Sequence, residues 1–496
     1  MSAKRKAPED PTEPPRPTKE QRLSPSSAPQ IFKLAYPSRS VSIHTKTPAF
    51  QRPTQVVSFS YDSTHTLRWD DSSLRYYVDP PRNADFNNAY ERWVRKTETR
   101  PRIDALLRAW SRTKKRMAET NPQAMAAGLG IGAMCWRGVM TKILTAPYED
   151  RDGWEMNVML VNGTLYLEEH LTRAKLRDKE GMAPRQRKQT YYGYAFESYC
   201  TRESPPNPHS GPSNTGWGGD VNTNEQWCSV VKTKLGDTRF IIGGEVDCVR
   251  SKYTGNTDTF VELKTSLVIR HPGDEARFEK KLLKFYFQSF LLGVPEIVVG
   301  FRQPSGHLST LQSFNTTALP RLVRGKPDAW DPAICLAWGE RFLMFLRSSI
   351  SAAISSANGT HTEDVKQDDE SALPGEKAVW RVRFEPGEGV SLERLSRDAV
   401  NDVESWDDDT TDGSDTVSAS ESRVGFIPAW YWEELCTESR SRPSQSSAGQ
   451  KAELDTRPKR GSDAAPGSGF ANGQRDDDSK DVNGTKPVKI PAGWQI

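Results

Sequence analysis

Two neighbouring apolar segments that carry acidic residues most constrain what this chain can fold into. Residues 240–247 and 260–265 both have the composition and the period-two alternation of β-strands. The segment 250–258 between them contains the Gly-Asn and Asp residues that favour a turn. The pattern therefore predicts a β-hairpin at the centre of the chain.

This hairpin would gather charged side chains on one side. Successive side chains of a strand point to opposite faces, so Glu245 shares a face with Asp247, and Glu262 shares a face with Lys264. If the hairpin pairs those two faces, three carboxylates and one ammonium group converge.

Such a cluster suits the hydrolysis of a phosphodiester or a pyrophosphate. Divalent ions such as Mg²⁺ prefer oxygen ligands, which these carboxylates and the backbone carbonyl of Leu263 would supply. The ion polarises a phosphate oxygen and acidifies a bound water, while Lys264 orients or deprotonates that water. The alternative is that Glu262 and Lys264 form a surface ion pair across the strands, as most isolated Glu-x-Lys patterns do.

Composition excludes several classes of protein. The net charge of +3 over 496 residues gives no argument for nucleic-acid binding by itself. The six cysteines are scattered without a Cys-x-x-Cys pair and the seven histidines lack metal-ligand spacing, so a disulfide framework or a zinc site is not predicted. No apolar run approaches the roughly 18 residues of a membrane span. We expect a soluble intracellular protein that contacts no membrane.

The chain divides by composition into one globular region and several polar segments. We predict a disordered tail over 1–29, a globular domain over 30–397, an acidic disordered linker over 398–422 and a disordered tail over 437–496. The aromatic segment 423–436 is too hydrophobic for a linker, so it is expected to dock on the domain or on a partner. Two short basic runs, at 4–6 and 457–460, favour the nucleus.

Basic residues recur on the helices predicted in the globular region. A helix near Ile103–Trp110 has an apolar stripe, with Arg108, Arg112, Lys114 and Lys115 on its other faces. A solvated face is the simpler interpretation there, and phosphate contact is the alternative. Arg137 lies in the apolar stretch 131–141, where a buried ion pair and a substrate contact both remain open, because one arginine can serve as both.

Further candidates flank the central segments. Glu197 ends the aromatic run 191–197 and is a candidate fourth acid. In the helix predicted over 275–292, Lys284 and Gln288 share one face with Lys281, opposite an apolar stripe. That face would balance the charge of a polyanion, although an ordinary amphipathic helix shows the same pattern. A strand over 379–384 is predicted to close the domain.

Five segments in series resemble the DXO-type mRNA-decapping nucleases. Each is a weak signal alone, but their order and spacing over about residues 31–384 match that family. They are Trp136-Arg137-Gly138, Gly193-Tyr194-Ala195-Phe196-Glu197, Glu245-Val246-Asp247, Glu262-Leu263-Lys264 and Gln288-Ser289-Phe290-Leu291-x-Gly293. The resemblance implies an α/β (α+β) fold of two mixed β-sheets flanked by helices, related to the PD-(D/E)xK nucleases, with the active site in the cleft between the sheets.

The resemblance also implies roles for individual residues. The metal ligands for one or two Mg²⁺ or Mn²⁺ ions would be Glu197, Glu245, Asp247, Glu262 and the Leu263 carbonyl. Lys264 and Gln288 would contact the scissile phosphate and the attacking water, Arg137 would bind the 5′ end, and Lys284 is our own candidate for guiding the RNA.

The implied substrates are RNA 5′ ends. The implied reactions remove pyrophosphate from 5′-triphosphate RNA, whole dinucleotides from incompletely methylated caps, and NAD from NAD-capped RNA. Three other interpretations remain open: a related nuclease acting on DNA, a scaffold that binds and stabilises a nuclear 5′-to-3′ exoribonuclease, and a 5′-to-3′ exonuclease in its own right. Like charges crowded at the site further predict that Asp247→Asn stabilises the metal-free protein.

Overall fold

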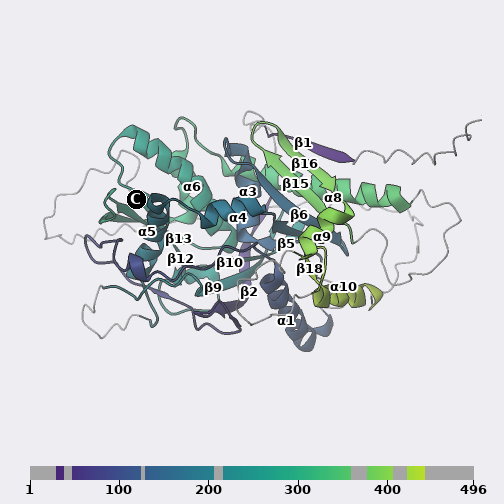
Figure 1. The fold of residues 1–496 in the computed structure, drawn as a ribbon, viewed down its shortest axis with the longest axis horizontal. Coiled ribbons are helices and arrows are strands. Elements are labelled where there is room, and N and C mark those ends of the chain that lie inside the picture. The colour runs from purple at the N-terminus through teal and green to yellow at the C-terminus, as the bar shows by residue number, and fades with distance from the viewer. Residues whose placement is uncertain are drawn as a thin grey trace, which may run out of the picture.

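Two β-sheets with helices on their faces form the body of the protein (Figure 1). The computed structural model describes residues 30–37, 47–123, 129–205, 216–358, 377–405 and 422–441. The two basic runs, the predicted N-terminal tail, most of the predicted acidic linker and most of the predicted C-terminal tail lie outside these ranges. None of the helices within them has both the length and the hydropathy that a bilayer crossing requires.

The larger sheet has ten strands in the described chain and is mostly antiparallel, except that β5 runs parallel to both β7 and β10. Its β6–β7 pair is a hairpin that turns at Asn162-Gly163. In spatial order the strands are β1 (Ile31–Ala35), β16 (Gly389–Arg394), β15 (Trp380–Glu385), β6 (Trp154–Val161), β7 (Thr164–Glu169), β5 (Ile131–Trp136), β10 (Thr238–Glu245), β9 (Gln226–Leu235), β2 (Phe50–Tyr61) and β3 (Leu67–Arg68).

The smaller sheet has six strands among the described residues. Its central strand β12 pairs parallel with β13 and antiparallel with the short β11. In order the strands are β14 (Leu308–Asn315), β13 (Glu296–Arg302), β12 (Phe260–Leu267), β11 (Cys248–Val249), β4 (Tyr76–Tyr77) and β8 (Thr201–Arg202).

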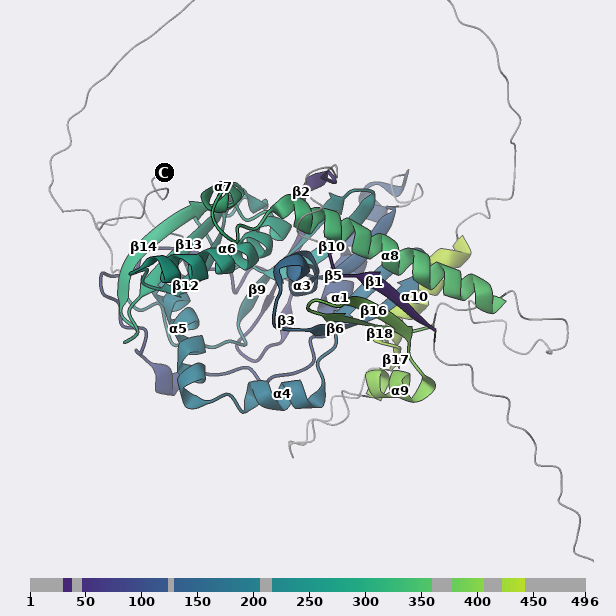
Figure 2. The same ribbon diagram turned by 90° about the horizontal axis from the view of Figure 1, so that it is seen from above.

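Helices cover both faces of each sheet. Phe240 and Ile242 point into the core shared with α3 (Arg137–Thr145), α6 (Pro272–Leu292) and α8 (Pro332–Asn358), whereas Ile241 between them points to α1 (Asp104–Thr120). This is the period-two alternation of a strand buried on both faces. In the smaller sheet, Leu263 of β12 packs toward α5 (Pro184–Cys200). The short helices α4 (Arg173–Glu180) and α7 (Leu319–Val323) lie at the edges (Figure 2).

Local sequence signals set the ends of two of these helices. The Asp331 side chain accepts a hydrogen bond of 2.8 Å from the Ala333 N–H and so caps α8, as its Asp-Pro start predicts. Gly293 ends α6 in the left-handed region at φ 73°, where a side chain would be strained. These two signals fix where α8 begins and where α6 ends.

The predicted central hairpin is wrong in its pairing. β10 and β12 do not pair with each other: β10 lies between β5 and β9 in the larger sheet, and β12 lies in the smaller one. The chain crosses from one sheet to the other at Val246-Asp247, and the true hairpin is the short β11–β12 pair. Alternation predicts the two faces of a strand but not its partner strand, which explains the error.

The C-terminal part of the described chain also departs from prediction. Strand β16 follows β15, so the segment 379–384 does not close the domain. The first residues of the predicted disordered linker form helix α9 (Arg397–Ser405), with Val403 buried. The aromatic segment was predicted to dock on the domain or on a partner, and in the structure it docks on the domain. It forms β17 (Arg423–Val424), β18 (Ile427–Pro428) and α10 (Ala429–Ser441), beyond the predicted end at 436.

Helix α10 lies against α1, and this contact corrects one prediction. Lys114, expected on a solvated face, is buried and its Nζ lies 2.7 Å from Glu434 and 2.5 Å from Glu438. A helix more than 300 residues later in the chain covers it, which no local pattern could indicate. Arg108, Arg112 and Lys115 are exposed, as predicted.

Candidate active site

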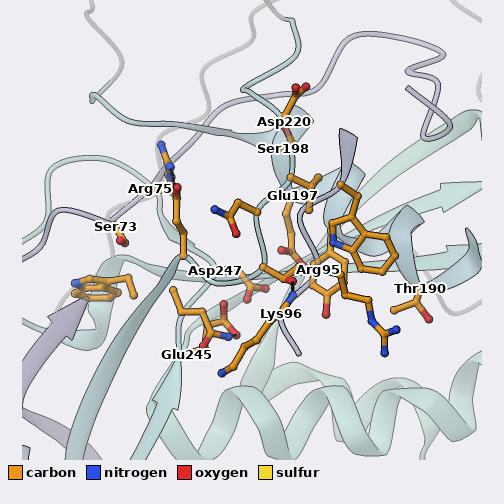
Figure 3. A pocket seen from close by; sticks show the side chains of 18 of the residues that line it. Ser73, Arg75, Arg95, Lys96, Thr190, Glu197, Ser198, Asp220, Glu245 and Asp247 are labelled. Carbon is orange, nitrogen blue, oxygen red and sulfur yellow. Dashed lines mark hydrogen bonds and ion pairs between the residues drawn. The ribbon is translucent and has the colours of Figure 1, made fainter. Parts of the chain in front are cut away.

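The acidic residues predicted from the sequence meet where the two sheets adjoin. Glu245 ends β10, Asp247 follows two residues later in the crossing between the sheets, and Glu262 lies in β12. Glu197, from the last turn of α5, completes the set. A pocket of about 660 Å³ opens over this point, and Glu197, Glu245 and Asp247 line it (Figure 3).

Glu262 forms the fully buried floor of the site. Its Oε2 accepts a hydrogen bond of 2.9 Å from Arg137 Nη1, and its Oε1 accepts one of 2.6 Å from Lys264 Nζ. Burial alone would raise the pKa of Glu262, but these two cations outweigh it and hold the pKa below its usual value. Arg137 therefore forms the buried ion pair that was one of its two interpretations.

Lys264 lies among the oxygen atoms that were predicted to hold a metal. Besides Glu262, its Nζ lies 3.2 Å from the Leu263 carbonyl oxygen and 3.7 Å from Asp247 Oδ2. Burial opposes its charge, yet Glu262 and Asp247 outweigh burial and raise the pKa of Lys264. In the described part of the chain, no three His, Cys, Asp or Glu side chains are already spaced to hold one ion.

This arrangement nevertheless fits a hard divalent cation. The oxygens of Asp247, Glu262 and Leu263 already surround one cation, the Lys264 ammonium, and oxygen is the ligand type that Mg²⁺ and Mn²⁺ prefer. A rotation of the Lys264 side chain would release these oxygens. The backbone supports this set, since Asp247 Oδ2 also accepts a hydrogen bond of 2.6 Å from the Leu263 N–H.

The other three carboxylates have raised pKa values, because their ionised forms are disfavoured in the site. Burial, followed by the negative charge of Asp247, raises the pKa of Glu245 to about 7 and the pKa of Glu197 well above its usual value. Burial and Glu262 raise the pKa of Asp247 to about 6, against the opposing effects of Lys264 and the Leu263 N–H. A site that raises several carboxyl pKa values without bound cations is suited to bind a cation.

Helix α6 lies beside the site without joining the cluster. It packs on α3 and β12, which places Lys284 and Gln288 in the same region of the molecule. Among the described residues, neither side chain forms a hydrogen bond or an ion pair with the four carboxylates. Their roles at the scissile phosphate and along the RNA stay predictions.

The walls of the pocket contain residues that sequence reasoning missed. Gln226 Nε2 donates a hydrogen bond of 3.0 Å to Glu245, and Arg75, Arg95, Lys96 and Lys179 bring positive charge to the walls. In Figure 3, Lys96 extends toward Glu245. These residues come from separate loops and helices, so spacing along the chain gives no signal for them. The walls carry both signs of charge, because Arg75 pairs with Glu203 and both Arg95 and Lys179 pair with Glu98. Cations beside the acidic base of the pocket suit a phosphate ester held over a metal.

Comparisons with known proteins agree with this geometry. The family model described as "RAI1 like PD-(D/E)XK nuclease" matches residues 51–432. A decapping nuclease RAI1 from Mycosarcoma maydis is 36% identical over 469 residues, which cover 80% of this chain and 90% of that protein. The human decapping and exoribonuclease protein is 36% identical over 316 residues, covering 61% of this chain and 76% of that protein.

Solved structures show the same fold. Rai1 of S. pombe, solved in complex with 3′-FADP, gives a TM-score of 0.56 at 25% identity and covers 74% of this chain and 100% of that one. Candida albicans Rai1, solved in complex with pU5 and Mn²⁺, gives a TM-score of 0.64 at 22% identity, covering 82% and 99%. The family match extends over most of the domain that carries the acidic site, and the chain belongs to the RAI1-like PD-(D/E)XK nuclease family.

Proposed function

We propose that this protein is a divalent-metal-dependent hydrolase that acts on RNA 5′ ends. The reactions are removal of pyrophosphate from 5′-triphosphate RNA, of the dinucleotide from incompletely methylated caps, and of NAD from NAD-capped RNA. The observation that carries the proposal is the cluster of Asp247, Glu262 and Lys264 beneath a pocket whose lining includes Arg95 and Lys96. Relatives over most of the chain are named decapping nucleases, which supports RNA 5′ ends over DNA as the substrate.

The residues that would hold the ion are Glu197, Glu245, Asp247, Glu262 and the Leu263 carbonyl. Mg²⁺ and Mn²⁺ both accept this oxygen-rich set, and Mn²⁺ occurs in the Rai1 structure from Candida albicans. When bound, the ion supplies Lewis-acid polarisation of a phosphate oxygen and an acidified water for hydrolysis.

The protein's own cations then have distinct tasks. Lys264 has a raised pKa and stays protonated at neutral pH, so it acts as a hydrogen-bond donor toward the water or the phosphate and not as a base. Arg137 holds Glu262 in its ionised form from the opposite side, which keeps that carboxylate available as a ligand. Arg95 and Lys96 on the walls bind the outer phosphates of the 5′ end.

One product analysis tests the reaction and the substrate together. The full-length protein is incubated with RNAs that carry a triphosphate, an unmethylated cap or an NAD cap, and with duplex DNA, each with Mg²⁺, with Mn²⁺ and with chelator. We expect metal-dependent release of pyrophosphate, cap dinucleotide or NAD, and no cleavage of duplex DNA. Equal release with chelator would overturn the metal mechanism, and cleavage of duplex DNA would overturn the substrate class.

Partner, location and exonuclease activity form a second set of proposals. The family resemblance implies that a nuclear 5′-to-3′ exoribonuclease is bound and stabilised, and the basic runs at 4–6 and 457–460 favour nuclear import. Some relatives are named for both decapping and exoribonuclease activity, so digestion from the 5′ end is also tested. Co-purification from nuclear extract and shortening of a 5′-monophosphate RNA by the pure protein separate a binding role from an intrinsic exonuclease.

A further inference from the structure

A second hollow, separate from the acidic pocket, lies along helix α1. Arg108, Arg112 and Arg116 recur every four residues on its exposed side, and Lys115 stands beside them. Together with Trp69 and Trp430, these four cations line a groove of about 820 Å³, which we call the α1 groove. Among the described residues lining it, Glu119 is the one carboxylate. The groove is therefore strongly basic, although the whole chain is nearly neutral.

Two tryptophans and two arginines form flat surfaces in this groove. The guanidinium carbon of Arg112 lies 5.4 Å from the centre of the Trp69 ring, and that of Arg108 lies 5.1 Å from the centre of the Trp430 ring. The Trp69 ring is 39% exposed and rests edge-on against the buried Phe59. Trp69 is thus in contact with both Phe59 and Arg112, and part of its side chain stays exposed.

Packed side chains connect the α1 groove to the wall of the acidic pocket. The groove continues into a smaller hollow of about 300 Å³ that shares Trp69, Arg112 and Arg116 and reaches Tyr253. The Tyr253 ring packs edge-on against Trp227 with ring centres 5.2 Å apart, and Trp227 lines the acidic pocket. Because Trp227 is buried, this contact joins the walls of the two hollows through packed rings.

One loop also forms part of both. Residues 69–75 join β3 to β4, with Trp69 in the groove and Arg75 in the acidic pocket. Asp71 fastens this loop, because its Oδ1 accepts hydrogen bonds of 2.8 Å from both Ser58 and Trp227. The groove and the pocket thus share a wall that is fixed on both sides.

We propose that the α1 groove binds the body of a single-stranded RNA whose 5′ end lies in the acidic pocket. Four residues of helix rise about 6 Å, which is close to the spacing of phosphates in an extended strand, so successive arginines can each meet one phosphate. The exposed faces of Trp69 and of the arginines accept stacked bases, a mode that tolerates any sequence. An acidic peptide would match the charge but would leave these stacking surfaces and the link to the pocket unused.

The inference rests on the proposed function, because it takes RNA as the substrate. The test distinguishes failure of the inference from failure of the proposed function. Binding of the full-length protein is measured by fluorescence anisotropy in chelator, with 5′-monophosphate RNAs of about 5 and about 20 nucleotides. We expect Arg112→Ala with Lys115→Ala to weaken binding of the long RNA about tenfold, to lower its salt slope by about two, and to leave the short RNA unchanged. Pyrophosphate release from the short triphosphate RNA should also stay unchanged, which reports the acidic pocket alone.

Three further variants control for folding and for charge. Lys115→Glu reverses the charge of an exposed side chain and leaves the core unchanged. Weaker binding of the long RNA by this variant would therefore report the lost charge and not unfolding. Trp69→Phe retains a stacking ring and should bind more tightly than Trp69→Ala. Arg341→Ala removes an exposed arginine from α8, on the other face of the larger sheet, and should bind both RNAs as the parent does.

Two outcomes overturn the proposal. One is equal loss of the short and the long RNA in the α1 groove variants. The other is unchanged RNA binding together with lost retention of a poly-glutamate peptide, which would identify the groove as a site for an acidic protein segment. Failure of all RNAs to react would instead overturn the proposed function and would leave the binding comparison intact.

Discussion

The ammonium nitrogen of Lys264 lies 2.6 Å from Oε1 of Glu262, an oxygen that would also serve as a ligand of a divalent ion. The Leu263 carbonyl at 3.2 Å and Asp247 at 3.7 Å complete its surroundings. The lysine of the Glu-x-Lys motif therefore neutralises the metal site from within when no metal is bound. Metal binding and the position of Lys264 should be coupled.

Lys264→Ala tests this coupling. Without the competing ammonium, Mn²⁺ should bind at least as tightly as to the parent, while pyrophosphate release falls by about 10²-fold or more because a donor to the phosphate is lost. Isothermal titration with Mn²⁺ and single-turnover kinetics measure the two effects. Lys326→Ala removes a lysine paired with Glu279 on α6 and serves as the control. Weaker metal binding in Lys264→Ala would show that the lysine supports the ligands instead of competing for them.

Glu262→Gln should remove most of the turnover and also destabilise the fold. The buried carboxylate accepts hydrogen bonds from Arg137 and Lys264. The amide group of glutamine would place its own N–H₂ donor against one of these two cations. Leaving a buried cation unpaired costs about 3 kcal/mol, which a chemical denaturation curve resolves. Glu279→Gln, a carboxylate paired with Lys326 away from the pocket, should keep full activity. A stable but inactive Glu262→Gln would mean that the ion pairs contribute little to folding.

Much of the site could be predicted because its signals are local. Alternation along β12 places Glu262 and Lys264 on one face, and the motif spacing brings Asp247 and Glu197 into the same set. Local alternation does not indicate which strand a given strand pairs with. The crossing at Val246-Asp247 puts β10 and β12 in different sheets, so the acids meet across a junction between sheets and not across a hairpin.

Other features depend on contacts between distant segments. Arg95 and Lys96 line the pocket only because the loop after Trp93 folds over α5, and nothing in their neighbours indicates this. Lys114 looks exposed until α10 covers it. Helix α9 did carry a local signal, since Val400 and Val403 lie three residues apart, but the acidic and serine-rich composition that follows obscured it.

The stability of the metal-free protein should decline as pH rises from about 4.5 to about 7. Glu245 has a pKa of about 7 in the folded state against 4.5 in model peptides, so the folded state binds more protons in this range and loses that advantage as pH increases. Asp247 and Glu197 act in the same direction, whereas Glu262, with its lowered pKa, acts in the opposite direction.

Glu245→Gln isolates this contribution. Denaturation in chelator at pH 5 and pH 8 should show a smaller difference for the variant than for the parent, by an amount on the order of 1–2 kcal/mol. Saturating Mg²⁺ or Mn²⁺ should abolish the decline, because metal replaces the protons. Identical pH profiles for the two proteins would show that Glu245 is not crowded as its surroundings indicate.

Lys284→Ala addresses the predicted role of α6 in guiding RNA. The residue is exposed on α6. Burial lowers the pKa of Lys142 on the adjacent α3, and the charges of Lys179 and Lys284 add to that effect, so these lysines lie in one region. The variant should bind long RNA more weakly than the parent and lose about one unit of salt slope, with a short capped oligonucleotide little affected. Lys280→Ala, exposed on the same helix one turn earlier, is the matched control. An unchanged salt slope would remove Lys284 from the RNA path.

Relief of crowding should stabilise the metal-free protein at Glu197 and not, as the sequence alone suggested, at Asp247. Asp247 is held in place, because its carboxylate accepts a hydrogen bond of 2.6 Å from the Leu263 N–H and lies 3.7 Å from Lys264 Nζ. Within the described residues, the Glu197 carboxylate forms no hydrogen bond or ion pair, yet it faces the charge of Asp247 and Glu245. Its ionised form therefore carries repulsion without a compensating contact.

Glu197→Gln should therefore raise the unfolding free energy in chelator by about 0.5–2 kcal/mol, whereas Asp247→Asn should lower it. Added Mg²⁺ or Mn²⁺ should reverse the order for Glu197→Gln, because the parent gains stability by binding the ion and the variant has lost a ligand. Thermal melts of the parent and both variants, each at pH 8 with chelator and with metal, provide the comparison. A Glu197→Gln protein that melts below the parent in chelator would mean that this carboxylate supports the fold, and that the site stores no repulsion for the metal to relieve.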